Sequence, residues 1–245
     1  MKCDPETGLC RVPESSVRPT PSTPNGSAAA TVRYVGDPMC SWCWGMSAEL
    51  EKVALYCKSH GLGFSVHVGG LRPGGGDPWN AQFKAFLRHE WEQIHRVTGQ
   101  PFDFTLLDTA DFNYDTEPAC RAVAVMAGLL EARGDDRMAV LTFFAGIQRR
   151  FYVGGADPKQ AEFYRDLCPG VGVSYEDFLA AFLSVASRTR TIQEFQRCRS
   201  WGVRGFPSVL LDMKDRLIPL ASGYTTSTAL IESISTLLRD STPSD

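Results

Sequence analysis

A Cys-x-x-Cys motif, Cys40-Ser41-Trp42-Cys43, separates a β-prone segment from a helical one, and this placement constrains the fold more than any other feature. Residues 31–36 are rich in β-formers, and Asp37-Pro38 ends that strand. From Ser41 the apolar residues recur with a helical period, and residues 64–68 form a second expected strand. The pattern predicts a strand–helix–strand unit with both cysteines at the N-terminus of the helix.

This position favours redox chemistry at the two cysteines. Unpaired backbone N–H groups and the positive end of the helix dipole stabilise a thiolate, so we expect a lowered pKa at Cys40. Cys43 lies one turn further and can form a disulfide with Cys40. A zinc site is the alternative, because Cys57 and His60 extend the spacing toward a zinc-ligand pattern. Cys57 and His60 lie about 20 Å from Cys43 along the same helix, too far to complete a zinc site with it. We therefore expect no metal, and we also expect no bound cofactor.

The rest of the chain predicts an interrupted α/β fold. A long, mostly helical stretch follows the first unit, and one of its expected helices covers residues 158–167. The strands 208–212 and 217–221 and the helix 227–239 then close the sheet. Residues 11–30 are rich in Pro, Ser, Thr and Ala, which is typical of a linker. The predicted organisation has three parts: a flexible N-terminal arm with Cys3 and Cys10 (1–30), a sheet domain in two halves (31–71 and 203–245), and a helical insertion domain (72–202).

A second signal is the dipeptide Phe206-Pro207 within GVRGFPS. A proline directly before a strand cannot donate to the ladder, and it is readily explained as a cis proline facing the two cysteines. The backbone of Phe206 could then pair with a substrate as an added strand does. An ordinary trans proline is far commoner in general, and only the order of the motifs along the chain favours the cis form.

These motifs together resemble a known family. The segments DPMCSWCWG and GVRGFPS, with the helical insertion between them, resemble the DsbA-like superfamily, and TEPACRAVAVMAG and IQRRFYVGG are similar to its FrnE-type branch of mostly cytosolic oxidoreductases. The resemblance covers about residues 31–240. It implies a thioredoxin fold with a large helical insertion and disulfide oxidoreductase or isomerase activity. It also implies that Cys40 is the nucleophile, Cys43 the resolving thiol and Pro207 the cis proline.

Two other classes of function stay open. Glutathione-dependent 2-hydroxychromene-2-carboxylate isomerases and kappa-class glutathione transferases share this fold, but they typically carry a serine where this chain has Cys40. A chaperone-like or partner-binding module that uses the insertion is the third possibility. The dipeptide Ser41-Trp42 differs from the Pro-His of exported DsbA proteins, which places a strong oxidase role in doubt.

Composition narrows the partners and the compartment. The chain has 245 residues and a net charge of −3, which argues against nucleic-acid binding. It contains no apolar run near the roughly 20 residues of a membrane span. Residues 1–30 contain no apolar export segment, which predicts a cytoplasmic protein if the chain is complete. The expected partners are disulfide-containing proteins or peptides, or glutathione.

The remaining residues of interest are the N-terminal cysteines, the residues around the motif, one histidine and four further cysteines. Cys3 and Cys10 could be an accessory redox pair that exchanges with the motif, a reduced tail, or a metal-capturing pair. Met39 and Trp42 are expected to form an exposed apolar surface that contacts substrate. Asp37 could influence the thiolate or only form a turn. His67 is expected to be structural. Buried free thiols without a role are expected at four positions: Cys57, Cys120, Cys168 and Cys198.

Overall fold

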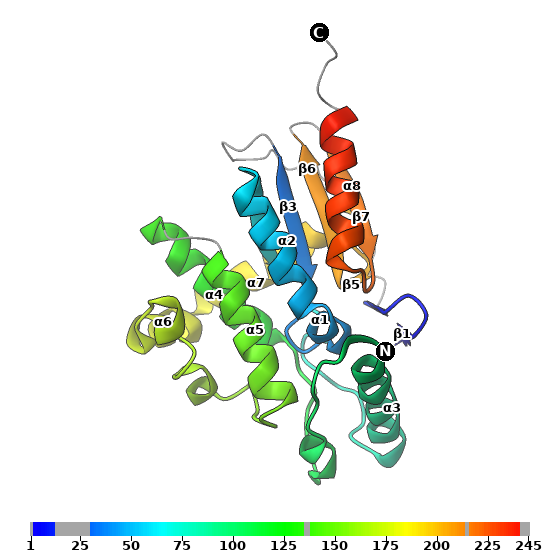
Figure 1. The fold of residues 1–245 in the computed structure, drawn as a ribbon. Helices are drawn as coiled ribbons and strands as arrows, with labels where there is room; N and C mark the ends of the chain where they lie inside the picture. Colours follow the sequence, from blue (N-terminus) through cyan, green and yellow to red (C-terminus); the bar gives the residue numbers. More distant parts are fainter. Residues whose placement is uncertain (1, 13–29, 135–137, 214–215, 241–245) are drawn as a thin grey trace.

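The computed structural model describes residues 2–12, 30–134, 138–213 and 216–240. Its main sheet has the strand order β4-β3-β6-β7 (Figure 1). β3 pairs with β4 in parallel, whereas the β3–β6 and β6–β7 pairs are antiparallel. The strands of this sheet are β3 (Thr31–Gly36), β4 (Gly63–Val68), β6 (Ser208–Met213) and β7 (Arg216–Ser222). A parallel unit followed by an antiparallel hairpin and a helix is the thioredoxin arrangement, as the sequence predicts.

Three helices of the sheet domain position the motif. The helix predicted from Ser41 is present in two parts that meet at Met46, α1 (Ser41–Gly45) and α2 (Ser47–Ser59). α2 lies beside α8 (Ser227–Asp240), and the Tyr56 hydroxyl and Ser235 Oγ are 2.8 Å apart (Figure 1). Because β3 lies in the sheet and α2 packs beside α8, the short α1 between them lies with its cysteines at the carboxyl end of β3.

The helical insertion lies between β4 and the short strand β5 (Gly205–Phe206). Its α-helices are α3 (Ala81–Thr98), α4 (Glu117–Arg133), α5 (Met138–Tyr152), α6 (Tyr175–Leu183) and α7 (Val185–Ser200). Its 3-10 turns are η1 (Thr105–Asp108), η2 (Ala161–Tyr164) and η3 (Pro169–Val171). The helix expected near residues 158–167 is therefore only a short turn. None of the helices in the described ranges has the length and apolar character needed to cross a bilayer.

An aromatic cluster joins the insertion to the motif. Trp44 stacks on Tyr152 with ring centroids 6.4 Å apart, and its indole Nε1 donates to the Pro101 carbonyl at 2.9 Å. Tyr152 in turn packs edge-on against Trp91, which is completely buried. Such buried aromatic pairs contribute about 0.5–1.5 kcal/mol beyond area burial. The insertion is thus packed directly against the helix that carries the cysteines.

The first described residues form a β-hairpin that pairs with β5, the short strand that follows the insertion. β1 (Lys2–Asp4) pairs with β2 (Leu9–Arg11), and β2 pairs antiparallel with β5. We call residues 2–12 the N-terminal hairpin. The sequence predicts a flexible arm for the whole of residues 1–30, and the hairpin differs from that prediction because a turn and a neighbouring strand edge satisfy its backbone. Residues 13–29 of the predicted arm lie outside the described residues.

Glu49 on α2 fixes the start of α8. Its carboxylate accepts from the Ser227 backbone N–H at 2.6 Å and from Lys52 Nζ at 2.8 Å. Burial would raise its pKa, but these hydrogen bonds lower the pKa of Glu49 from 4.5 to about 2. A carboxyl group with a depressed folded-state pKa stabilises the fold above its unfolded value and loses this contribution as the pH falls.

A Glu49→Gln variant is therefore expected to be less stable than the parent at pH 7 and to lose less stability between about pH 5 and pH 2. Urea unfolding at a series of pH values measures both effects. The control is Glu51→Gln, an exposed glutamate on the same helix. Equal pH slopes for the parent and Glu49→Gln would contradict the assignment.

Candidate active site

Cys40 is placed by a tight turn at the end of β3. Its backbone N–H donates to the Asp37 carbonyl at 3.0 Å, and its carbonyl accepts from the Trp44 N–H at 3.1 Å. Cys40 has extended backbone angles and is the N-cap residue of α1. Cys43 follows within the same turn, and both thiols are free and buried. The structure thus brings the two predicted cysteines together at the first turn of the helix.

Phe206 and Pro207 lie across the site from the turn that carries Cys40 and Cys43. Their peptide bond is cis, as the motif order predicts. The Cys40 Sγ donates to the Phe206 carbonyl oxygen at 3.8 Å. The Phe206 ring lies against Gly69, where an added Cβ would be only 2.0 Å from two ring carbons. The dipeptide and the cysteine motif, 166 residues apart in sequence, therefore form one site.

Burial, and not the helix terminus, dominates the pKa of Cys40 in this structure. Removal from water raises the pKa of the Cys40 thiol well above 9.0, and the neighbouring Cys43 and the Asp37 carboxylate raise it further. The sequence predicts a lowered pKa because helix N–H groups favour a thiolate. That prediction is wrong for this closed arrangement, because a completely buried thiolate lacks hydration.

Asp37 is a buried structural acceptor beneath the motif. Its carboxylate accepts from the backbone N–H groups of Met39 at 2.8 Å and Leu71 at 2.6 Å. Cys120 Sγ donates to it at 3.3 Å. Burial raises the pKa of Asp37, although these hydrogen bonds oppose the rise. Both interpretations of Asp37 hold, because it braces the turn and its charge disfavours the Cys40 thiolate.

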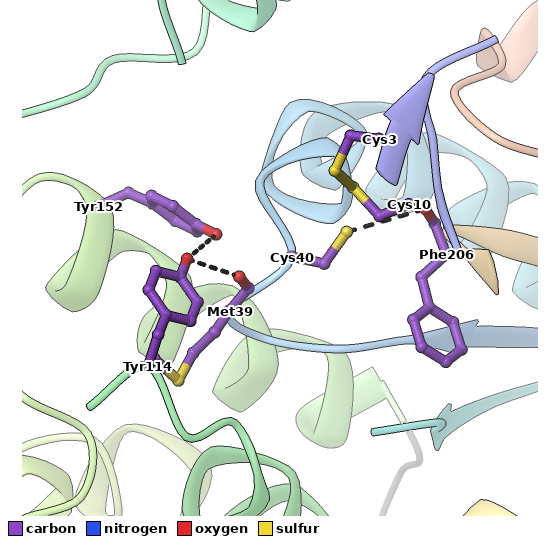
Figure 2. Close-up of a disulfide and its surroundings, with 7 residues drawn as sticks. All are labelled: Cys3, Cys10, Met39, Cys40, Tyr114, Tyr152 and Phe206. Carbon is purple, nitrogen blue, oxygen red and sulfur yellow. Dashed lines mark hydrogen bonds between the residues drawn. A yellow bond between two sulfur atoms is a disulfide. The ribbon is translucent and has the colours of Figure 1, made fainter. Parts of the chain in front are cut away.

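Met39 and Trp42 do not form the exposed surface that the sequence predicts. Met39 is 1% exposed, and its carbonyl accepts from the Tyr114 hydroxyl at 2.9 Å (Figure 2). Trp42 is 2% exposed, and its ring packs on Tyr224 with centroids 5.9 Å apart. An added Cβ at Gly8 would lie 2.9 Å from the Trp42 ring. The prediction is wrong because the insertion packs on Met39 and the N-terminal hairpin covers Trp42.

The sequence gives no sign of the tyrosine pair beside the motif. Tyr114 and Tyr152 are both buried, and their hydroxyl oxygens are 3.4 Å apart (Figure 2). Burial raises the pKa of both phenols, so they remain neutral donors. Tyr152 lies within the segment IQRRFYVGG, but Tyr114 lies outside the helices and nothing in the sequence pairs the two residues.

The other cysteines have the character expected from the sequence. Four free thiols are buried, and burial raises their pKa values: Cys57, Cys120, Cys168 and Cys198. Cys120 contacts Asp37 of the site. His67 is held by Ser65 Oγ at 2.9 Å and by Glu194 Oε1 at 2.6 Å, which is a structural setting. In the described part of the chain, no three His, Cys, Asp or Glu side chains gather as metal ligands would.

Cys3 and Cys10 form a disulfide at the edge of this site. They lie directly opposite each other in the N-terminal hairpin, and Cys10 is completely buried. Cys10 pairs with Phe206, the residue whose carbonyl accepts from Cys40. Figure 2 shows the Cys40 side chain pointing toward this disulfide. The structure therefore brings the two cysteine pairs of the sequence to one place.

Among known proteins, the chain is similar to several solved structures. Neither the protein-family models nor the curated proteins contain a match. A structure described as a "putative protein disulfide isomerase from Nitrosomonas europaea" is 33% identical, with 87% of this chain and 99% of that chain covered and a TM-score of 0.76. The cytosolic disulfide reductase DsbM from Pseudomonas aeruginosa is 28% identical, with 86% and 100% covered and a TM-score of 0.65.

Two further matches are a complex with glutathione and an isomerase. The structure of DsbM with GSH is also similar, with 28% identity, 85% of this chain and 99% of that chain covered, and a TM-score of 0.64. A 2-hydroxychromene-2-carboxylate isomerase is 14% identical, with 85% and 95% covered and a TM-score of 0.56. At that identity the isomerase shows only a shared fold. These similarities span both the sheet domain and the helical insertion.

Proposed function

This chain belongs to the DsbA-like superfamily of thioredoxin-fold oxidoreductases, and from that premise we propose that it catalyses thiol–disulfide exchange through Cys40 and Cys43. The observation that carries the proposal is the meeting of two free thiols with the cis Phe206–Pro207 peptide bond. The Cys40 thiolate attacks a substrate disulfide, one substrate sulfur leaves as a thiolate, and a mixed disulfide forms. Cys43 then attacks Cys40 Sγ, which releases the second substrate thiolate and leaves the Cys40–Cys43 disulfide.

The substrates we propose are protein or peptide disulfides and the disulfide of glutathione. The Phe206 backbone lies beside Cys40, where an extended peptide can pair as an added strand. The similarity to DsbM, solved with GSH, supports glutathione as the small partner. We also propose a cytoplasmic location, which the cytosolic DsbM supports. Protein-disulfide isomerase specificity and the FrnE-type branch remain predictions from the sequence.

A redox titration in glutathione buffers tests this function. We expect a reversible Cys40–Cys43 disulfide, detected by mass spectrometry of the peptide that contains both residues. Turnover of a disulfide substrate is expected to fall at least about tenfold in Cys43→Ser, because the mixed disulfide is then no longer resolved within the chain. Cys57→Ser is the control, since Cys57 is buried on α2 away from the motif.

Three outcomes would contradict the proposal. The absence of any reversible Cys40–Cys43 disulfide would exclude the exchange cycle. Full activity of Cys43→Ser toward a glutathione-dependent isomerisation or transfer would favour the glutathione-dependent class, which needs no resolving thiol. A binding activity that survives in the double variant Cys40→Ser/Cys43→Ser would favour the partner-binding module.

A further inference from the structure

The N-terminal hairpin occupies the place where a peptide substrate would pair with the site. β2 runs antiparallel to β5, with Cys10 opposite Phe206 and Arg11 opposite Gly205. The Val12 N–H extends this pairing and donates to the Arg204 carbonyl at 3.1 Å. An extended segment that adds to an exposed strand edge is a common mode of peptide recognition. The chain thus presents one of its own segments to its own active site.

Contacts from three other parts of the fold hold the hairpin in this position. The Tyr224 N–H donates to the Thr7 carbonyl at 3.1 Å, and Gln93 Nε2 donates to the Pro5 carbonyl at 3.1 Å. Gly8, with a φ of +62°, allows the turn to lie directly on Trp42 and Tyr224. The hairpin is also closed internally by the Gly8 N–H, which donates to the Asp4 carbonyl at 2.8 Å. It is therefore docked by specific contacts on several sides.

We propose that the Cys3–Cys10 disulfide is an intramolecular substrate of Cys40, presented by the docked hairpin in the position of a bound peptide. This inference rests on the proposed function of Cys40. Cys10 is the sulfur that Cys40 attacks, because β2 lies between β1 and β5 and Cys10 is buried in one apolar cluster with Cys40 and Cys43. Cys3 lies on the outer strand and is partly exposed, so its thiolate can leave into water.

The exchange balances within one chain. Cys40 thiolate attacks Cys10 Sγ, the Cys3–Cys10 bond breaks, and Cys3 leaves as a thiolate that takes up a proton. Cys43 then loses its proton and attacks Cys40 Sγ, which releases Cys10 as a thiolate. Two electrons move from the Cys40–Cys43 pair to the Cys3–Cys10 pair, and the reverse sequence returns them. The hairpin is thereby a second redox centre that shares electrons with the motif.

The test uses the full chain with Cys43→Ser, oxidised only at Cys3–Cys10. After incubation at about pH 8, acid quenching and alkylation of free thiols, trypsin digestion separates residues 3–11 from the peptide with Cys40. We expect a disulfide between Cys10 and Cys40, with the alkyl group on Cys3. No such linkage, with Cys3–Cys10 intact, would overturn the inference and leave a purely structural disulfide.

Matched double variants identify the sulfur that is attacked. Cys3→Ser/Cys43→Ser leaves Cys10 with Cys40, and Cys10→Ser/Cys43→Ser leaves Cys3 with Cys40. Under mild oxidation with diamide, the first is expected to form its cross-link at least about tenfold faster, because Cys10 lies on the strand next to β5. Equal rates, or a faster Cys3 cross-link, would overturn the assignment of Cys10.

The triple variant Cys3→Ser/Cys10→Ser/Cys43→Ser separates this inference from the proposed function. If it forms a mixed disulfide between Cys40 and glutathione while Cys43→Ser forms no Cys10–Cys40 linkage, only the intramolecular exchange is overturned. If neither variant reacts, the nucleophile assignment of Cys40 fails as well.

Discussion

Replacing Gly8 with alanine is expected to raise the alkylation rate of Cys40 by roughly 100-fold, because the hairpin that covers the thiol then undocks. Gly8 has a φ of +62°, a region that costs an L-residue about 1–2 kcal/mol. The new Cβ would also lie 2.6 Å from the Tyr224 Cβ and 2.9 Å from the Trp42 ring. Overpacking of this kind costs about 1–3 kcal/mol. The clash with Tyr224 and Trp42 exists only in the docked state, and each 1.4 kcal/mol changes the open population about tenfold.

The same variant is expected to shift the pH dependence of alkylation. Burial is the largest cause of the raised Cys40 pKa, and it disfavours the charged thiolate. Undocking admits water to the sulfur, so the pKa of Cys40 falls and the alkylation profile moves to lower pH. The contributions of Cys43 and Asp37 to the raised pKa remain, because neither residue belongs to the hairpin.

Gly61→Ala is the matched control for this experiment. Gly61 has a φ of +66° but no atom within 4 Å of an added Cβ, and it lies after α2, away from the hairpin. It therefore carries the same backbone strain without the clash. Alkylation of the fully reduced chain is followed by peptide mass spectrometry, and amide exchange of residues 8–12 in the oxidised chain reports docking. If Gly8→Ala matches Gly61→Ala in both measurements, the hairpin does not cover Cys40.

Replacing Gly69 with alanine is expected to disrupt the site from the opposite side. The added Cβ would be 2.0 Å from two carbons of the Phe206 ring, and Phe206 is buried, with 1% of its surface exposed. The ring must therefore move with its backbone, and the Phe206 carbonyl would lose its contact with Cys40 and its pairing with Cys10. We expect a loss of about 1–3 kcal/mol in the free energy of unfolding and a fall in disulfide-exchange turnover.

Thermal unfolding and turnover measure this effect together. A loss of 1 kcal/mol lowers Tm by about 2–4 °C in a chain of this size. The control is Gly128→Ala on α4, where no atom lies within 4 Å of the added Cβ. Helix propensity favours alanine there by about 1 kcal/mol, so this control is expected to be as stable as the parent or more stable. A Gly69→Ala protein with unchanged Tm and turnover would mean that Phe206 is not held by this packing.

Sequence patterns identified the fold and the parts of the site that depend on local signals. A strand followed by Cys40-x-x-Cys43 and a helix, with Phe206-Pro207 before a hairpin and a final helix, predicted the thioredoxin arrangement. These signals are readable because turn residues and the period of apolar residues determine local structure within a few residues. The helix near residues 158–167 was the exception, since its apolar residues pack in the insertion core without forming more than one turn.

The sequence by itself therefore determined which residues we propose for the exchange, and the tertiary structure decided the environment in which they lie. Cys40 and Cys43 follow from a local pattern, and cis Pro207 was favoured by the order of the motifs along the chain. The burial of Trp42 depends on the hairpin and on Tyr224, which pack on its ring. The direction of the Cys40 pKa shift depends on the burial of the thiol and on its neighbours Cys43 and Asp37. The hairpin's composition permits either a free tail or a docked strand, and the edge of β5, the surfaces of Trp42 and Tyr224 and the side chain of Gln93 select the docked one. Burial and long-range strand pairing depend on residues far apart in the chain, and therefore no local sequence pattern predicts them.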